Sequence, residues 1–152
     1  MRIKPADLGR QDLLDLLAFH LESAANQDCS HALSVSSLQS DDVLMFEARD
    51  ETGALLGCAA LKILSPDHGE IKSVRTHPDH LRKGVSRALM AHLTDVARAR
   101  RIKRLSLETH PTPAYAAARA LYEALGYTYC PPFGAYTEDG KSVFMTRCLE
   151  QV

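Results

Sequence analysis

Basic residues and a glycine gather where a predicted strand turns into a long predicted helix, within residues 70–89. The N-terminus of a helix carries unpaired N–H groups and about half a positive charge, and glycine lets a ligand approach the backbone closely. These features predict an anion site that would fit a pyrophosphate. The spacing matches neither a Walker loop nor a Gly-x-Gly-x-x-Gly dinucleotide turn. The alternative is a glycine that merely opens a helix beside solvated cations. The residues concerned are Arg82, Lys83, Gly84 and Arg87.

Other residue types that could do chemistry show weaker patterns. His77 and His80, with His68 nearby, lack matching Cys or carboxylate spacing, so we predict no structural metal. The cysteines are widely spaced without Cys-x-x-Cys, which argues against a zinc ribbon, a thioredoxin-like site or a dense disulfide frame. We interpret them as reduced core thiols, with Cys130 buried in a strand. The four are Cys29, Cys58, Cys130 and Cys148.

Hydrophobic periodicity predicts the strands and the helix around the basic loop. The runs 43–49 and 54–64 flank a turn and predict an antiparallel hairpin. Residues 69–76 read as the next strand, which Pro78 ends because proline cannot donate to a sheet ladder. Apolar residues then recur at helical spacing in a helix that ends near Arg100.

The remaining segments predict a mixed sheet with helices around it. A strand at 104–109 directly after the long helix indicates a right-handed βαβ crossover. Thr112 and Pro113 fit the first positions of a second helix, which stops at Gly126. Further predicted elements are a short strand around Ile3, an amphipathic helix within the first 25 residues, a loop with a short helix at 26–42, and strands at 127–130 and 143–149. We expect an α/β (α+β) fold and a single domain over residues 1–152.

Composition excludes several classes of protein. The chain has 152 residues with 18 Lys and Arg against 19 Asp and Glu, a formal net charge of -1 that does not favour a nucleic-acid binder. The basic run 98–104 could attract nucleic acid, but a role at the negative helix end fits it better. No apolar stretch is long enough to span a bilayer, and no secretory signal is visible, so we predict a cytoplasmic protein without membrane contact.

Residues 43–149 resemble the GNAT superfamily of acyl-CoA-dependent N-acetyltransferases. The family's loop motif (Gln/Arg)-x-x-Gly-x-(Gly/Ala) falls on Leu81, Gly84 and Ser86, so only the glycine matches strictly. Residues 118–127 read Ala-x-x-Leu-Tyr-x-x-x-Gly-Tyr, which matches the second motif well. The chain also looks like a branch of small bacterial GNAT proteins whose acceptors are mostly unassigned.

The resemblance implies a mixed, mostly antiparallel sheet of about six to seven strands flanked by helices, with a βαβ acyl-CoA-binding core. It implies acetyl-CoA as cosubstrate, no metal, Glu70 as the base or a substrate anchor, and Tyr122 as the general acid. The alternatives are a surface carboxylate at a strand edge for Glu70 and an amphipathic core tyrosine for Tyr122. Tyr115 stands where many members have an Asn that touches pantetheine. The cofactor-binding residues that it implies are Val74, Arg75, Thr76, Arg82, Lys83, Gly84, Val85, Ser86, Arg87 and Tyr115.

For the acceptor, the resemblance implies a primary amine of a small molecule, amino acid or peptide, acetylated by direct attack in a ternary complex. The candidate acceptor-binding residues are His20, Glu22, His31 and Tyr136. A non-catalytic acyl-CoA-binding module is the alternative, since Leu81 and Ser86 depart from the loop motif. Many family members pair through edge strands, so a homodimer is expected by analogy.

Overall fold

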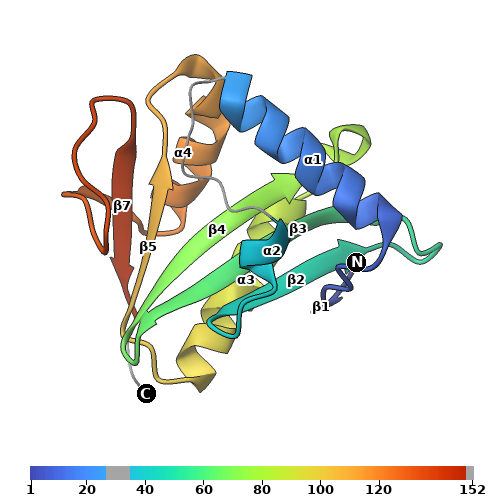
Figure 1. Ribbon diagram of the computed structural model, residues 1–152, viewed down its shortest axis with the longest axis horizontal. Helices are drawn as coiled ribbons and strands as arrows, with labels where there is room; N and C mark the ends of the chain where they lie inside the picture. The colour runs from blue at the N-terminus through green and yellow to red at the C-terminus, as the bar shows by residue number, and fades with distance from the viewer. Residues whose placement is uncertain (27–34, 150–152) are drawn as a thin grey trace.

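A computed structural model of the protein describes residues 1–26 and 35–149, with side chains described outside residues 19–36. It contains seven strands, four α-helices and two short 3-10 helices within these ranges (Figure 1). In chain order they are β1 (Arg2–Pro5), α1 (Gln11–Asn26), α2 (Val35–Leu38), β2 (Val43–Arg49), β3 (Leu55–Ser65), β4 (His68–Thr76), η1 (Pro78–His80), α3 (Val85–Ala99), β5 (Arg104–Thr109), η2 (Pro113–Tyr115), α4 (Ala116–Ala124), β6 (Thr128–Cys130) and β7 (Val143–Cys148).

The strands form one seven-stranded sheet in the order β1-β2-β3-β4-β5-β7-β6. Only β4 and β5 run parallel, and the other neighbours pair antiparallel. Helix α3 connects these two parallel strands, as the βαβ crossover requires. The predicted mixed, mostly antiparallel sheet is therefore confirmed.

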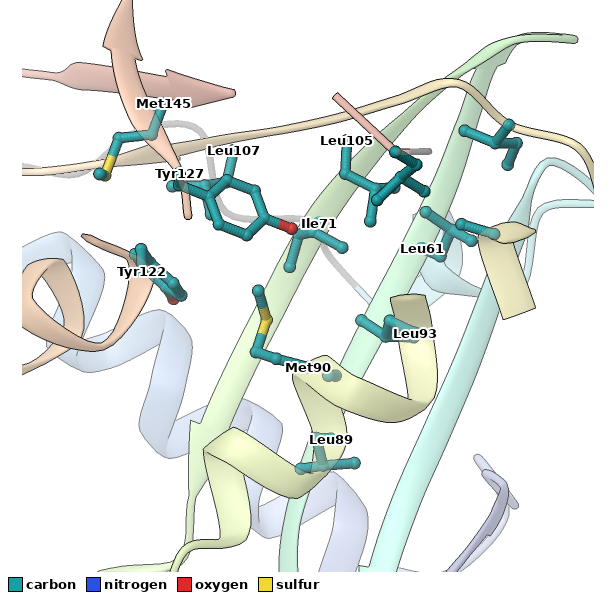
Figure 2. Close-up of a cluster of buried hydrophobic side chains, with 14 of the residues drawn as sticks. Leu61, Ile71, Leu89, Met90, Leu93, Leu105, Leu107, Tyr122, Tyr127 and Met145 are labelled. Carbon is teal, nitrogen blue, oxygen red and sulfur yellow. The ribbon is translucent and has the colours of Figure 1, made fainter. Parts of the chain in front are cut away.

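Helices cover both faces of the sheet, and each face has its own apolar core. On the α3 face, Ile71 and Leu107 pack with Leu89 and Leu93 of α3 and with Tyr122 of α4 (Figure 2). On the α1 face, a second core joins leucines of α1 and α2 to β2 and β3. Figure 1 shows α1 and α2 in front of the sheet and α3 behind it. Because side chains alternate along a strand, the neighbours of Ile71 in β4 point toward the α1 face.

Helix α3 confirms the apolar stripe predicted from the sequence. Val85, Leu89 and Leu93 are buried, and Val96 packs at the edge of the same core. No helix within the described residues is long and apolar enough to cross a membrane.

Two local predictions need correction. The segment after Thr112 opens as the 3-10 helix η2, and the α-helix begins only at Ala116. Cys58 is a buried thiol, but Cys130 is half-buried and Cys148 is exposed, so the predicted core thiols hold for Cys58 alone among the cysteines described here. Cys130 is the last residue of the edge strand β6 and Cys148 is the last residue of β7, so both exceptions lie at the ends of their strands. Cys29 lies outside the described residues.

A buried charge cluster fixes α1 to the sheet. The Arg49 guanidinium in β2 donates to both oxygens of Asp12 in α1, at 2.6 and 3.0 Å, and to both oxygens of Glu47, at 2.9 and 3.2 Å. The Glu47 side chain is 0% exposed. A buried carboxylate such as that of Glu47 is stable only where cations and hydrogen-bond donors pair with it. Because the Arg49 guanidinium that pairs with Glu47 also binds both oxygens of Asp12, it fixes the orientation of α1.

Candidate functional site

Strands β4 and β5 diverge halfway along their length, which opens the sheet. They pair only over His68–Ile71 and Arg104–Leu107. Further along, Cys58 of β3 faces Arg75 while Ala60 faces Lys72, so β4 contains one extra residue there. Ser73 within this bulge has a left-handed φ of 56°. A bulge bends its strand and strengthens its twist, and Figure 1 shows β4 leaving β5 toward α1.

The predicted anion loop follows the free end of β4. Gly84 has a φ of 78° and immediately precedes α3, and Arg82 is also left-handed, with a φ of 63°. A Cβ built on Gly84 would meet nothing within 4 Å, so the backbone here is open to a ligand. The first N–H groups of α3 have no partner within the helix. Left-handed residues beside a helix start create a concavity of N–H groups that suits an anion.

The side chains of the loop fit the same role. Arg82, Lys83 and Arg87 are exposed, whereas the Val85 side chain is buried and offers the loop only its amide. Leu81 is 59% exposed and its side chain has no polar group, so the side-chain contacts to a pyrophosphate would come from the basic residues. The residues present therefore fit a diphosphate.

Ser86, which departs from the family motif, has a structural partner. Its Oγ lies 2.7 Å from Thr76 Oγ1 at the end of β4. This hydrogen bond joins the start of α3 to the strand that borders the opening. The substitution therefore leaves the backbone of the loop in place and adds a link to β4.

Glu70 lies on the α1 face of β4 in a buried polar cluster. Its side chain is only 4% exposed. The Tyr136 hydroxyl donates to Glu70 Oε2 at 2.6 Å, and Lys72 Nζ lies 3.2 Å from the same oxygen. Lys72 Nζ also donates to the Tyr136 oxygen at 2.7 Å. The alternative of a surface carboxylate at a strand edge is therefore wrong, because the loop between β6 and β7 covers this position.

Packed aromatic rings hold Tyr136 in this cluster. Its ring centroid lies 5.2 Å from that of Phe133 and 5.4 Å from that of Phe144. Burial and the hydrogen bond to Glu70 raise the pKa of Tyr136, so the phenol stays neutral and acts as a donor. Glu108 of β5 also influences Tyr136 electrostatically, and it accepts a hydrogen bond of 2.6 Å from Ser142 Oγ.

Tyr122 lies on the opposite face of the sheet from Glu70. It is buried in the core formed with α3, and its ring stands 6.1 Å from that of Tyr127 (Figure 2). Burial raises the pKa of Tyr122 to about 12, so its hydroxyl is protonated at neutral pH. Because the two residues lie on opposite faces, only the opening between β4 and β5 could bring one substrate to both.

The structure also brings Arg75 near Tyr115. Arg75 stands at the end of β4, and loss of solvation lowers its pKa while the nearby Tyr115 acts in the opposite direction. The Tyr115 ring packs edge-on against His110, 4.8 Å away. The Nδ1–H of His110 donates to the carbonyl oxygen of Lys141 at 2.9 Å, so the β5–η2 turn is held against the chain before β7.

Some predicted residues cannot be placed. The side chains of His20 and Glu22, and the whole of His31, lie outside the described residues. Among the residues that are described, no group of three or more His, Cys, Asp or Glu side chains could hold a metal ion. His77 and His80 do lie close, with ring centroids 5.5 Å apart.

Lys72 and Glu108 are site residues that the sequence reasoning missed. A signal was available for both, because strict alternation places Lys72 on the same face as Glu70, and places Glu108 opposite the buried Leu107. The contacts with Tyr136 had no sequence signal.

Comparison with known proteins agrees with this architecture. The model of the acetyltransferase (GNAT) family matches residues 11–127. The uncharacterized N-acetyltransferase YsnE of Bacillus subtilis is 42% identical over 98% of this chain and 100% of its own. The alanine N-acetyltransferase of ribosomal protein bS18 from Escherichia coli is 31% identical over 72% of each chain. A crystal structure from Klebsiella pneumoniae, described as an acyl-CoA N-acyltransferase, superposes with a TM-score of 0.80 at 29% identity and covers 98% of this chain and 97% of its own. The chain belongs to the GNAT family of acetyltransferases.

Proposed function

We propose that this protein transfers the acetyl group of acetyl-CoA to the primary amine of a small molecule, amino acid or peptide. The transfer proceeds by direct attack of the amine on the thioester within a ternary complex. The bS18 relative, whose name describes acetylation of an alanine, is consistent with an amine acceptor.

The pyrophosphate of acetyl-CoA lies at the loop before α3 in this proposal. The amides of residues 83–87 and the cations Arg82, Lys83 and Arg87 bind it, since these residues flank Gly84, where the backbone is open. Residues 74–76 then contact pantetheine, because this part of β4 has no pairing with β5 among the described residues. Tyr115 borders the same opening beside Arg75.

Glu70 accepts a proton and Tyr122 donates one during the transfer. Glu70 takes a proton from the incoming amine, directly or through one water, as the new C–N bond forms. A backbone N–H of β4 near the bulge stabilises the charge that develops on the thioester oxygen. As the C–S bond breaks, Tyr122 donates its hydroxyl proton to the sulfur, and solvent restores both residues to their starting states.

The observation that carries this proposal is the divergence of β4 from β5 after Ile71, next to the buried carboxylate of Glu70 on one face of the sheet, with the protonated buried phenol of Tyr122 on the other face. The test is release of free thiol from acetyl-CoA with a panel of amines. We expect Glu70→Gln to lower kcat by about 100-fold, as loss of a general base does. Full activity of Glu70→Gln in a folded protein would contradict the role of Glu70.

The alternative is an acyl-CoA-binding module without catalysis. It predicts a rise in unfolding temperature with CoA and no thiol release with any amine. In our proposal both acetyl-CoA and CoA stabilise the fold, by about 2.7 kcal/mol at 100 times the dissociation constant, and ATP does not. Homodimer formation, through one of the edge strands β1 and β6, and a cytoplasmic location stay predictions.

A further inference from the structure

The hydrogen bonds around Glu70 leave its two oxygens in different situations. Both contacts that the carboxylate receives from described side chains end on Oε2. An ammonium group has only donors, so in the contact between Lys72 and Tyr136 the phenol oxygen accepts. The single Tyr136 proton is therefore directed to Glu70, which agrees with the short distance of 2.6 Å. Oε1 remains as the oxygen that can receive a further proton.

The residues that make this arrangement come from distant parts of the chain. Tyr136 is 66 positions after Glu70, in the loop between β6 and β7. Its ring packs against Phe133 and Phe144, and Lys72 Nζ lies 5.4 Å from the ring centre. The aromatic packing fixes the ring, the cation fixes the hydroxyl rotor, and the hydroxyl in turn fixes the carboxylate.

We propose that Lys72 and Tyr136 are positioning residues that orient Glu70 so that Oε1 receives the proton of the acceptor amine. This inference rests on the proposed acetyl transfer. The nitrogen lone pair forms the bond to the thioester carbon, and the N–H proton moves to Oε1. Without the two donors on Oε2, the carboxylate would rotate about its terminal bond and present Oε1 less often.

The variant that tests the role is Tyr136→Phe, which keeps the packed ring and removes the hydroxyl. We expect kcat to fall about ten-fold, because a small misplacement of a catalytic group is enough for such a loss. The KM for acetyl-CoA should not change. Tyr129→Phe is the matched control, since the Tyr129 hydroxyl makes an equivalent 2.7 Å bond to Glu123 at the surface. This control should keep full kcat.

The decisive comparison repeats Tyr136→Phe in the Glu70→Gln background. If Tyr136 acts through Glu70, the second change should lower kcat by less than about two-fold there. The same ten-fold loss in both backgrounds, or no loss in either, would overturn the proposal. Lys72→Met should behave like Tyr136→Phe, and Lys72→Arg should recover part of the rate because it restores a cationic donor.

A stability measurement separates this inference from the proposed function. Tyr136→Phe should lower the unfolding temperature in the wild-type background and have a smaller effect with Glu70→Gln, whether or not an acceptor has been found. Equal shifts in unfolding temperature in the two backgrounds would contradict the hydrogen bond between Tyr136 and Glu70. Absence of thiol release with every amine, together with unequal shifts, would instead reject the acetyl transfer and, with it, the catalytic part of the inference.

Discussion

Replacement of Tyr122 by phenylalanine tests how the leaving thiolate is stabilised. Burial raises the pKa of Tyr122 to about 12, whereas a thiol such as that of cysteine has a pKa of about 8.5. Complete transfer of the phenol proton to the thiolate is therefore uphill by about 3.5 pH units, or roughly 5 kcal/mol. The Tyr122 proton is therefore only partly transferred in the transition state, where its hydrogen bond to the developing charge on sulfur contributes about 1.5–3 kcal/mol. We expect Tyr122→Phe to lower kcat by about 10- to 150-fold.

The assay is steady-state thiol release at saturating acetyl-CoA and amine. Tyr127→Phe is a matched control, because it also removes a buried hydroxyl from this core and that hydroxyl has no hydrogen-bond partner among the described residues. The control should keep its kcat, and neither variant should change the KM for acetyl-CoA. An unchanged kcat in Tyr122→Phe would contradict the role of Tyr122 as the general acid. A loss beyond about 1,000-fold would refute the reasoning that a hydrogen bond, rather than full proton transfer, is the main contribution.

Three further predictions concern the loop and the charge cluster. Gly84→Ala places a side chain at a φ of 78°, so the unliganded protein should lose about 1–2 kcal/mol, and titration calorimetry should show CoA binding weakened by at least about ten-fold. Arg49→Met removes the guanidinium that pairs with the fully buried Glu47, so it should lower the free energy of unfolding in urea by about 3–5 kcal/mol. Adding Glu47→Leu should recover much of this loss. Additive effects of the two substitutions would argue against the pairing. The hydrogen bond from Arg49 lowers the pKa of Asp12 from its usual 3.8 to about 2. The stability that this bond contributes is therefore complete above pH 3.8 and is lost as the pH falls through about 2. Because the Asp12 side chain is 40% exposed, this contribution should stay under about 1 kcal/mol, and urea unfolding of Asp12→Asn should show a flatter acid limb than the wild type.

Local patterns were sufficient for most of the secondary structure. The hairpin of β2 and β3 and the apolar stripe of α3 follow from periodicity, which depends on residues close in sequence. The loop at Gly84 was recognisable because glycine and the helix start lie side by side in the chain. The start of the second helix was misplaced, because Pro113 suits the first turn of a 3-10 helix as well as that of an α-helix.

The site could be predicted only in part. Strand alternation alone places Lys72 on the same face of β4 as Glu70. The bulge at Ser73 gave no sequence signal, since serine has no preference for the left-handed φ of 56° that it adopts. The Asp12–Arg49 bond, between residues 37 positions apart, was equally out of reach.

The sequence by itself determined the order of strands and helices along the chain, the glycine loop before α3 and the family motifs, because each depends on neighbours within a few residues. The tertiary structure decided what surrounds each functional side chain. Glu70 reads as an exposed carboxylate in its own strand, yet Tyr136, 66 positions later, buries it and donates to it. The physical reason is that strand periodicity fixes the side on which a residue points, whereas the covering of that side depends on loops whose paths follow from packing across the whole sheet.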